Sequence, residues 1–103
     1  MGTNYTDFLT PKNCALTLID YQPAMFFGVQ SHDRLTIMHN TALLAKTAKL
    51  FKIPTVLSTV AKDSFSGPMD SVITSVFKGQ ELIDRTSINA WLDANFRKAV
   101  EAT

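Results

Sequence analysis

The sequence predicts an α/β fold built on a parallel sheet, and two observations carry this prediction. The first is the apolar run from Cys14 to Ile19, which lacks polar alternation and is therefore typical of a strand covered on both faces. The second is the order of the elements, because a helical pattern follows this strand and a second β-branched run follows the helix. A strand, a helix and a strand in this order form a right-handed crossover unit with parallel strands.

The composition limits the class of protein. A chain of 103 residues forms one domain at most, and 46% apolar with 18% charged residues is typical of a globular protein. Ten basic and nine acidic residues are scattered, so there is no basic stripe for nucleic acid. A single cysteine excludes an internal disulfide, and no apolar run approaches the roughly eighteen residues that a membrane span needs. We therefore expect a cytoplasmic protein that binds neither nucleic acid nor membranes.

The first half of the chain divides into an arm, a strand and a helix. Residues 1–13 are polar, and we expect an N-terminal arm that docks through its few large apolar side chains, Tyr5, Phe8 and Leu9. After the first strand, Pro23 indicates a loop or short turn over residues 22–29. From about Arg34 to Phe51, apolar residues recur at the spacing of an amphipathic helix, which Pro54 ends.

The second half predicts shorter elements. A β-branched second strand spans 55–60, and a loop spans 61–68. A small helix is expected over 69–77, ended by Gly79, and a short third strand over 81–84. The pattern becomes helical again from Asp93.

Asp20 is the first functional candidate, because it directly follows the first strand. Ligands of open α/β sheets bind just outside the carboxyl ends of the strands. Arg85 follows the third strand in the same way, so a parallel sheet would bring the two side chains to one edge. Such a pair orients the carboxylate for a role as general base or anion site. The alternatives are that Asp20 only orders its loop, and that Arg85 forms a surface ion pair or pairs with Asp84.

Other kinds of site have little support. Cys14 precedes Asp20 by six residues of extended chain, about 20 Å, so Asp20 is not its base, and Cys14 is better explained as a small buried apolar residue. His32 and His39 have no second carboxylate or cysteine at ligand spacing, so exposed or capping histidines are the better explanation. Neither a phosphate-binding glycine loop nor a serine elbow is present. We therefore expect no metal and no cofactor.

Several short motifs together resemble one family. Asp20-Tyr21-Gln22 closes the first strand, and an Asn-Ala-Trp stretch follows Arg85. The chain resembles the isochorismatase-like cysteine hydrolases, and within them the YcaC-like branch, from about Cys14 onward. The matching segments are Asp20-Tyr21-Gln22, Ile53-Pro54-Thr55, Gly67-Pro68, Arg85, Ile88-Asn89-Ala90-Trp91 and Phe96-Arg97-Lys98-Ala99-Val100.

The resemblance implies a Rossmann-like, three-layer α/β/α fold with six mostly parallel strands. This chain, residues 1–103, would supply the front half, about three strands in the order 3-2-1. Strand one would then be an unpaired apolar edge, which is an aggregation hazard in isolation.

The resemblance also implies the roles of individual residues. Asp20 matches the Asp that takes the proton of a cysteine thiol, and Arg85 matches a basic position that is Lys in many relatives. Further candidates for substrate binding are Gln22, Phe26, Phe27, Asn89 and Trp91. Buried packing is the alternative for the two phenylalanines, and a structural role is the alternative for Asn89 and Trp91. Some relatives carry an Asp and two His as a metal site after strand two, but residues 61–66 contain no His.

The expected function follows from this resemblance. We expect part of a hydrolase that acts on a small amide, imide or ester-like substrate through a thioester. The nucleophilic cysteine would lie beyond Thr103, in the C-terminal half of the same protein, so this chain alone would be inactive. The family further implies a homo-oligomer. The alternative is a truncated or degenerate member that acts as a structural, oligomerising protein without catalysis.

Overall fold

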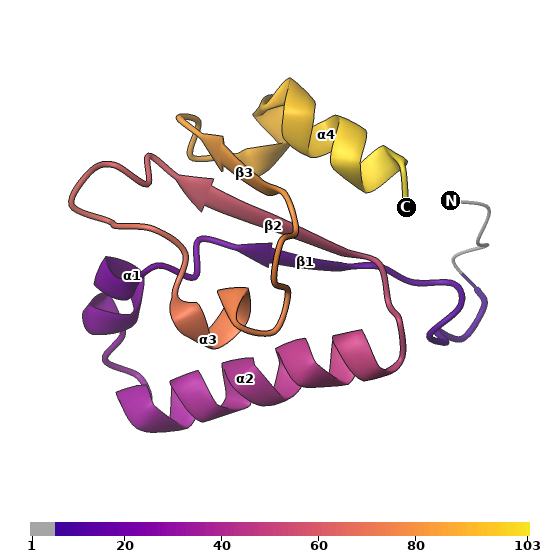
Figure 1. Ribbon diagram of the computed structural model, residues 1–103, viewed down its shortest axis with the longest axis horizontal. Coiled ribbons are helices and arrows are strands. Elements are labelled where there is room, and N and C mark those ends of the chain that lie inside the picture. Colours follow the sequence, from indigo (N-terminus) through magenta and orange to yellow (C-terminus); the bar gives the residue numbers. More distant parts are fainter. Residues whose placement is uncertain (1–5) are drawn as a thin grey trace.

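A three-stranded parallel sheet forms the centre of the protein, as a computed structural model shows (Figure 1). The structure describes residues 6–103, so Tyr5 lies outside the described part. The strand order is β1-β2-β3, with β2 in the middle, which confirms the predicted fold class and strand order. The strands span Leu16–Ile19 (β1), Thr55–Val60 (β2) and Leu82–Arg85 (β3).

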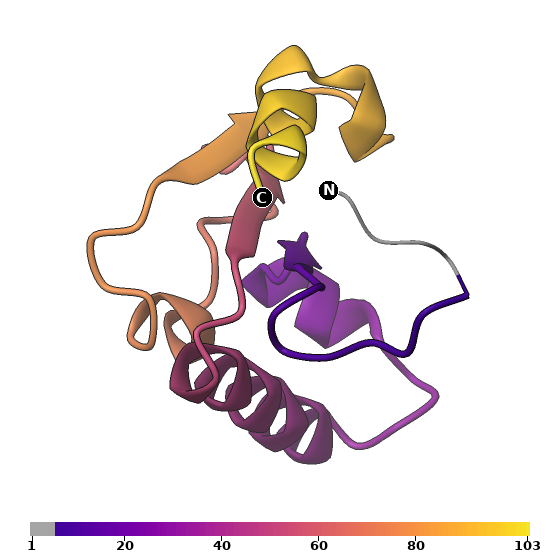
Figure 2. The ribbon, with the colours of Figure 1, turned by 90° about the vertical axis from the view of Figure 1, so that its right-hand side faces the viewer.

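Helices cover both faces of the sheet. The long helix α2 and the short helix α3 pack on one face, and α4 with the 3₁₀ turn η1 packs on the other (Figure 2). The helix α1 lies at the carboxyl end of β1 (Figure 1). These elements span Pro23–Gly28 (α1), Arg34–Leu50 (α2), Ser71–Thr74 (α3), Ala90–Leu92 (η1) and Ala94–Glu101 (α4).

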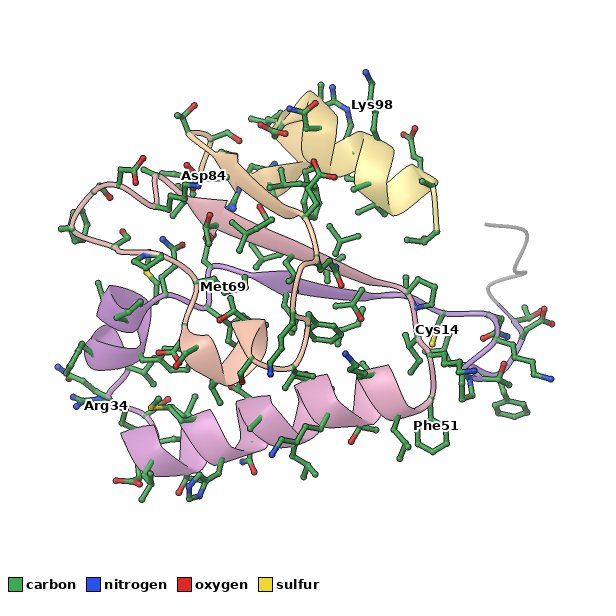
Figure 3. All side chains as sticks on the ribbon, viewed as in Figure 1. Cys14, Arg34, Phe51, Met69, Asp84 and Lys98 are labelled. Carbon is green, nitrogen blue, oxygen red and sulfur yellow. The ribbon has the colours of Figure 1, made fainter. Side chains whose placement is uncertain are left out.

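Two small cores hold the layers together, because successive residues of a strand point to opposite faces. Leu18 and Leu57 pack against Met69 and Ile73 on the α2 and α3 side. Figure 3 shows Met69 between the sheet and this layer. On the other face, the core consists of Val56, Ile83, Ala90 and Phe96. A buried polar residue on a strand is therefore an exception to this apolar pattern.

Aspartates cap the N-termini of α2, α3 and α4. Each side chain accepts a hydrogen bond from a backbone N–H in the first turn, which satisfies a group that the helix itself leaves unpaired. Asp33 accepts from Thr36 in α2, Asp70 accepts from Val72 in α3, and Asp93 accepts from Phe96 in α4.

Three expectations require correction. Residues 23–28 form a helix instead of a loop, because the fixed φ of Pro23 suits a first helical turn. The helix expected over 69–77 is regular only over Ser71–Thr74 and continues as turns. Phe8 and Leu9 are largely exposed, so these two residues of the arm do not dock on the domain.

The strand β1 lies at one edge of the sheet. Within residues 6–103 it pairs only with β2, with Leu16 beside Thr55 and Ile19 beside Ser58. The edge is therefore unpaired, as expected. Over the same residues, no helix has the length and apolar character that crossing a membrane would require.

Candidate active site

An ion pair joins Asp20 and Arg85 at the carboxyl edge of the sheet. Arg85 Nη1 donates to Asp20 Oδ1 at 2.8 Å, and Nη2 donates to Oδ2 at 3.1 Å. Each terminal nitrogen of the guanidinium therefore bonds to one oxygen of the carboxylate. This two-point geometry makes such pairs strong and directional. The Arg85 side chain is fully buried, whereas 28% of the Asp20 side chain is exposed. The cation is thus enclosed by protein, and the carboxylate faces solvent.

Arg85 reaches Asp20 by crossing the middle strand. Arg85 is the last residue of β3, and Asp20 follows β1, so β2 lies between their backbones. The guanidinium passes the small side chain of Ser58, whose hydroxyl accepts a hydrogen bond from Nη1 at 3.0 Å. Nη2 also donates to the carbonyl of Ile88 in the loop after β3, at 3.1 Å. Neither contact was predicted from the sequence, and the one sequence signal for Ser58 is a small polar residue in a buried apolar strand.

The backbone of Asp20 turns sharply away from the sheet. Its φ is +64°, in the left-handed region that Asp tolerates better than most residues. Its N–H still donates to the carbonyl of Ser58 at 3.0 Å, which adds one β-sheet hydrogen bond after the end of β1. The turn therefore lets the strand end while its carboxylate stays at the sheet edge.

Gln22 continues the sheet with its side chain. Its amide oxygen accepts from the Val60 N–H at 3.0 Å, and its amide nitrogen donates to the Val60 carbonyl at 3.0 Å, as a neighbouring peptide group would. The same nitrogen also donates to the Gly67 carbonyl at 2.6 Å. Gln22 has no exposed surface, and both of its amide donors are used. The structure thus gives Gln22 a backbone-pairing role where the sequence suggested a substrate contact.

An apolar cavity adjoins the carboxylate. Its volume is about 200 Å³, and Asp20 is its one charged lining residue. Phe26 is buried in its wall and packs against Tyr21 with the ring centroids 6.0 Å apart. The remaining lining residues are Ile19, Tyr21, Met25, Val29 and Ile37. The cavity is therefore lined by one acidic residue among aliphatic and aromatic ones.

The other three predicted binding residues lie outside this cavity wall. Phe27 is 64% exposed, and the Arg34 guanidinium stacks 4.1 Å from the centre of its ring. Asn89 is exposed and caps η1, since its side chain accepts from the Trp91 N–H at 3.0 Å. Trp91 itself is about half exposed. A structural role thus accounts for the Asn89 side chain, and the side-chain hydrogen bonds to Asp20 within residues 6–103 come from Arg85.

Cys14 lies at the far end of the sheet from the ion pair. It precedes β1, whereas Asp20 follows it, and Figure 3 shows Cys14 at the end of the sheet opposite to Asp84 of β3. Asp20 therefore does not act on this thiol. No cluster of three or more His, Cys, Asp or Glu side chains able to hold a metal occurs among residues 6–103.

Comparisons with known proteins were made by sequence and by structure. No protein-family model matches the chain. The chain is 31% identical over 96 residues to the probable hydrolase YcaC of Escherichia coli (strain K12). The aligned residues make up 92% of this chain and 46% of YcaC.

Two solved structures share the fold. YcaC from Pseudomonas aeruginosa, with hexane-2,5-diol and covalent acrylamide, superposes with a TM-score of 0.85 at 30% identity, over 98% of this chain and 50% of that one. The YcaC gene product of Escherichia coli, described as an octameric hydrolase of unknown specificity, superposes with a TM-score of 0.84 at 31% identity, over 97% and 49%. The chain spans about half the length of the relatives it matches. Sequence and structure agree that this protein is a homologue of YcaC, whose three-stranded α/β half it shares.

Proposed function

We propose that this chain supplies the carboxylate and the cation of an isochorismatase-like cysteine hydrolase. The observation that carries the proposal is the two-point ion pair of Asp20 and Arg85 at the carboxyl edge of a parallel sheet. Ligands bind at such edges, and the homologue YcaC is described as a probable hydrolase. The partly exposed carboxylate is the group that a substrate or a nucleophile reaches.

The proposed reaction uses Asp20 as the general base. Asp20 removes the proton of a cysteine thiol, and the thiolate attacks the carbonyl carbon of an amide, imide or ester. The carbon–nitrogen or carbon–oxygen bond breaks, Asp20 returns the proton to the departing amine or alcohol, and a thioester remains. Water then cleaves the thioester to a carboxylic acid and regenerates the thiol. Arg85, which keeps its positive charge throughout, holds the carboxylate in place.

The thiol in this proposal comes from a part of the protein outside these 103 residues. Cys14 lies at the wrong end of β1, and the chain contains no other cysteine. The relative from Pseudomonas aeruginosa was solved with covalent acrylamide, and acrylamide adds to strong nucleophiles such as thiolates. The covalent acrylamide in this relative is in keeping with the proposed thiol chemistry.

The cavity beside Asp20 supports a small, uncharged substrate. A solvent-open space of about 200 Å³ suits a small molecule, and its lining residues other than Asp20 are uncharged. The charge of Asp20 is already balanced by Arg85, so a charged substrate would find no free counter-charge there.

The experiment compares two matched variants of the intact protein that carries this chain. Hydrolysis is measured on a panel of small amides, imides and esters, for the wild type, Asp20→Asn and the exposed control Asp7→Asn. We expect Asp20→Asn to lower kcat/KM by about 10²- to 10⁴-fold, as loss of a general base does, and Asp7→Asn to leave it unchanged. Full activity of Asp20→Asn would refute the proposal.

Labelling with acrylamide provides an independent readout. Peptide mapping after brief exposure should find the fast adduct on a cysteine outside residues 1–103, and it should form more slowly in Asp20→Asn. Labelling confined to a slowly reacting Cys14 would instead favour a protein without thiol catalysis.

Assembly is the second candidate function, and the octameric homologue favours it. We propose that the intact protein forms homo-oligomers. Light scattering behind a sizing column measures the mass directly. An oligomer that hydrolyses no member of the panel would support the structural, non-catalytic alternative.

A further inference from the structure

We infer that Ser58 is a positioning residue, which holds Arg85 in the orientation that presents the Asp20 carboxylate. The inference rests on the proposed function, because it concerns the placement of the proposed base. It also restricts the role of Arg85, whose guanidinium orients Asp20 and does not touch the substrate.

The hydrogen bonds of Arg85 leave no free terminal donor. A guanidinium carries five N–H groups, four of them on its two terminal nitrogens. Nη1 donates to Asp20 Oδ1 and Ser58 Oγ, and Nη2 donates to Asp20 Oδ2 and the Ile88 carbonyl. The fifth group, on Nε, is buried and has no acceptor among the described residues. A substrate therefore meets the exposed carboxylate and not the cation.

The hydroxyl of Ser58 has a fixed orientation. It donates its single hydrogen to the Ile83 carbonyl at 2.8 Å, so its oxygen is left to accept from Arg85 Nη1 at 3.0 Å. Ser58 is completely buried and lies on the middle strand, between Ile19 and Ile83. Its backbone carbonyl accepts from the Asp20 N–H, but its hydroxyl bonds within the site only to Arg85.

The unused Nε group explains why this anchor matters. The two terminal nitrogens of Arg85 both donate to Asp20, which is an end-on arrangement of the guanidinium. In a side-on arrangement, Nε and one terminal nitrogen would donate instead. Side-on pairing would satisfy Nε, but it would turn the guanidinium and move the carboxylate. The hydrogen bonds from the guanidinium to Ser58 and Ile88 oppose this turn. Because displacements of about 1 Å cost roughly 10²-fold in rate, the loss of one anchor should be measurable.

The test uses Ser58→Ala in the intact protein, with Thr59→Val as the control. Both residues are fully buried neighbours on β2, and both variants remove one hydroxyl, but Thr59 bonds to Asp84 and not to the ion pair. We expect Ser58→Ala to lower kcat by about tenfold to 10²-fold with KM within about twofold, and Thr59→Val to retain kcat. Ser58→Thr, which keeps the hydroxyl, should restore most of the rate.

A second readout does not need turnover. Rotation of the Arg85 guanidinium, followed by ¹⁵N NMR of its terminal nitrogens, should be slow in the wild type and in Thr59→Val and faster in Ser58→Ala. Should Ser58→Ala not fold, Ser58→Cys keeps the volume and weakens the hydrogen bond, and it is measured in the same way.

The outcomes separate this inference from the proposed function. Absence of hydrolysis by the wild type refutes the proposed function, whereas unchanged Arg85 rotation in Ser58→Ala refutes this inference. A raised KM with unchanged kcat, or equal losses in Ser58→Ala and Thr59→Val, would also overturn it, because these results indicate substrate contact or general damage to the strand.

Discussion

Asp20 and Arg85 are joined across an intervening strand, with two hydrogen bonds of 2.8 and 3.1 Å between side chains that belong to opposite edges of the sheet. The ion pair therefore links the carboxyl ends of β1 and β3 across the carboxyl end of β2. Its two members differ in environment, because the cation is enclosed and the anion is partly hydrated. The two charges therefore differ in how much each depends on its partner.

Removing the anion should destabilise the protein more than removing the cation. Asp20→Asn leaves the buried guanidinium without a counter-charge and should lower the free energy of unfolding by about 3 kcal/mol. Asn also tolerates the left-handed backbone at this position, so the variant keeps the backbone conformation while it removes the charge and one of the two acceptors for Arg85. Arg85→Met leaves a carboxylate that water still reaches, and the loss should be smaller. Urea unfolding of both variants and of the double variant measures the coupling, and equal losses would contradict the asymmetry.

The side chain of Gln22 should be essential for folding and not only for activity. Gln22→Glu keeps the shape but replaces two donors by acceptors, which then oppose the carbonyls of Val60 and Gly67. We expect a loss of about 1–3 kcal/mol for each buried group left unsatisfied. Gln30→Glu, on an exposed loop, is the matched control and should change the stability little. Thermal unfolding measures both, and a stable Gln22→Glu would contradict the role assigned to this amide.

Ala61 has a strained backbone that glycine should relieve. Its φ is +42° at the end of β2, in a region that costs an L-residue about 1–2 kcal/mol. Ala61→Gly should therefore be neutral or stabilising by up to about 1 kcal/mol, because the flexibility of Gly in the unfolded chain offsets part of the gain. Ala42→Gly, in α2, should destabilise by about 1 kcal/mol. Chemical denaturation measures the free energy of unfolding of both variants, and we expect it to fall for Ala42→Gly but not for Ala61→Gly. Equal destabilisation of the two variants would contradict the backbone strain at Ala61.

Filling the cavity should change substrate preference. Val29 lines the space beside Asp20, so Val29→Trp should raise KM about tenfold for the larger acyl groups of the panel and less for the smallest. Leu43→Trp, exposed on α2, is a control that adds an indole away from the cavity. Steady-state kinetics on a series of acyl groups is the measurement. A uniform loss across the series would show that the cavity does not receive the acyl group.

The elements that the sequence predicted well are those with a strong periodic signal. The run ending at Ile19, the helix from Arg34 and the strand from Thr55 each combine a clear pattern with a clear stop, and the structure has all three. The helix Pro23–Gly28 was missed because it is short and begins at Pro23, a residue that in isolation favours a loop. Short elements take their conformation from tertiary packing, which local patterns do not contain.

In the candidate site too, some features were predictable from the sequence and others were not. Asp20 and Arg85 were identifiable because each follows a predicted strand, and parallel strands end at one edge; in the structure Arg85 is the last residue of β3. The contacts of Ser58 and Ile88 with the guanidinium depend on how a long side chain crosses β2 and how the next loop folds back. Gln22 follows the same strand as Asp20, but its amide pairs with the backbone of Val60, a pairing that no spacing rule contains.

The free edge of β1 has a consequence for timing. A strand laid alongside it in parallel would finish level with Asp20, and the loop that follows such a strand would be delivered to the carboxylate. Sheet completion and arrival of a reaction partner would then be a single event. Until that event, as far as residues 6–103 show, Arg85 already orients the Asp20 carboxylate, and the proposed base would have no thiol proton to remove.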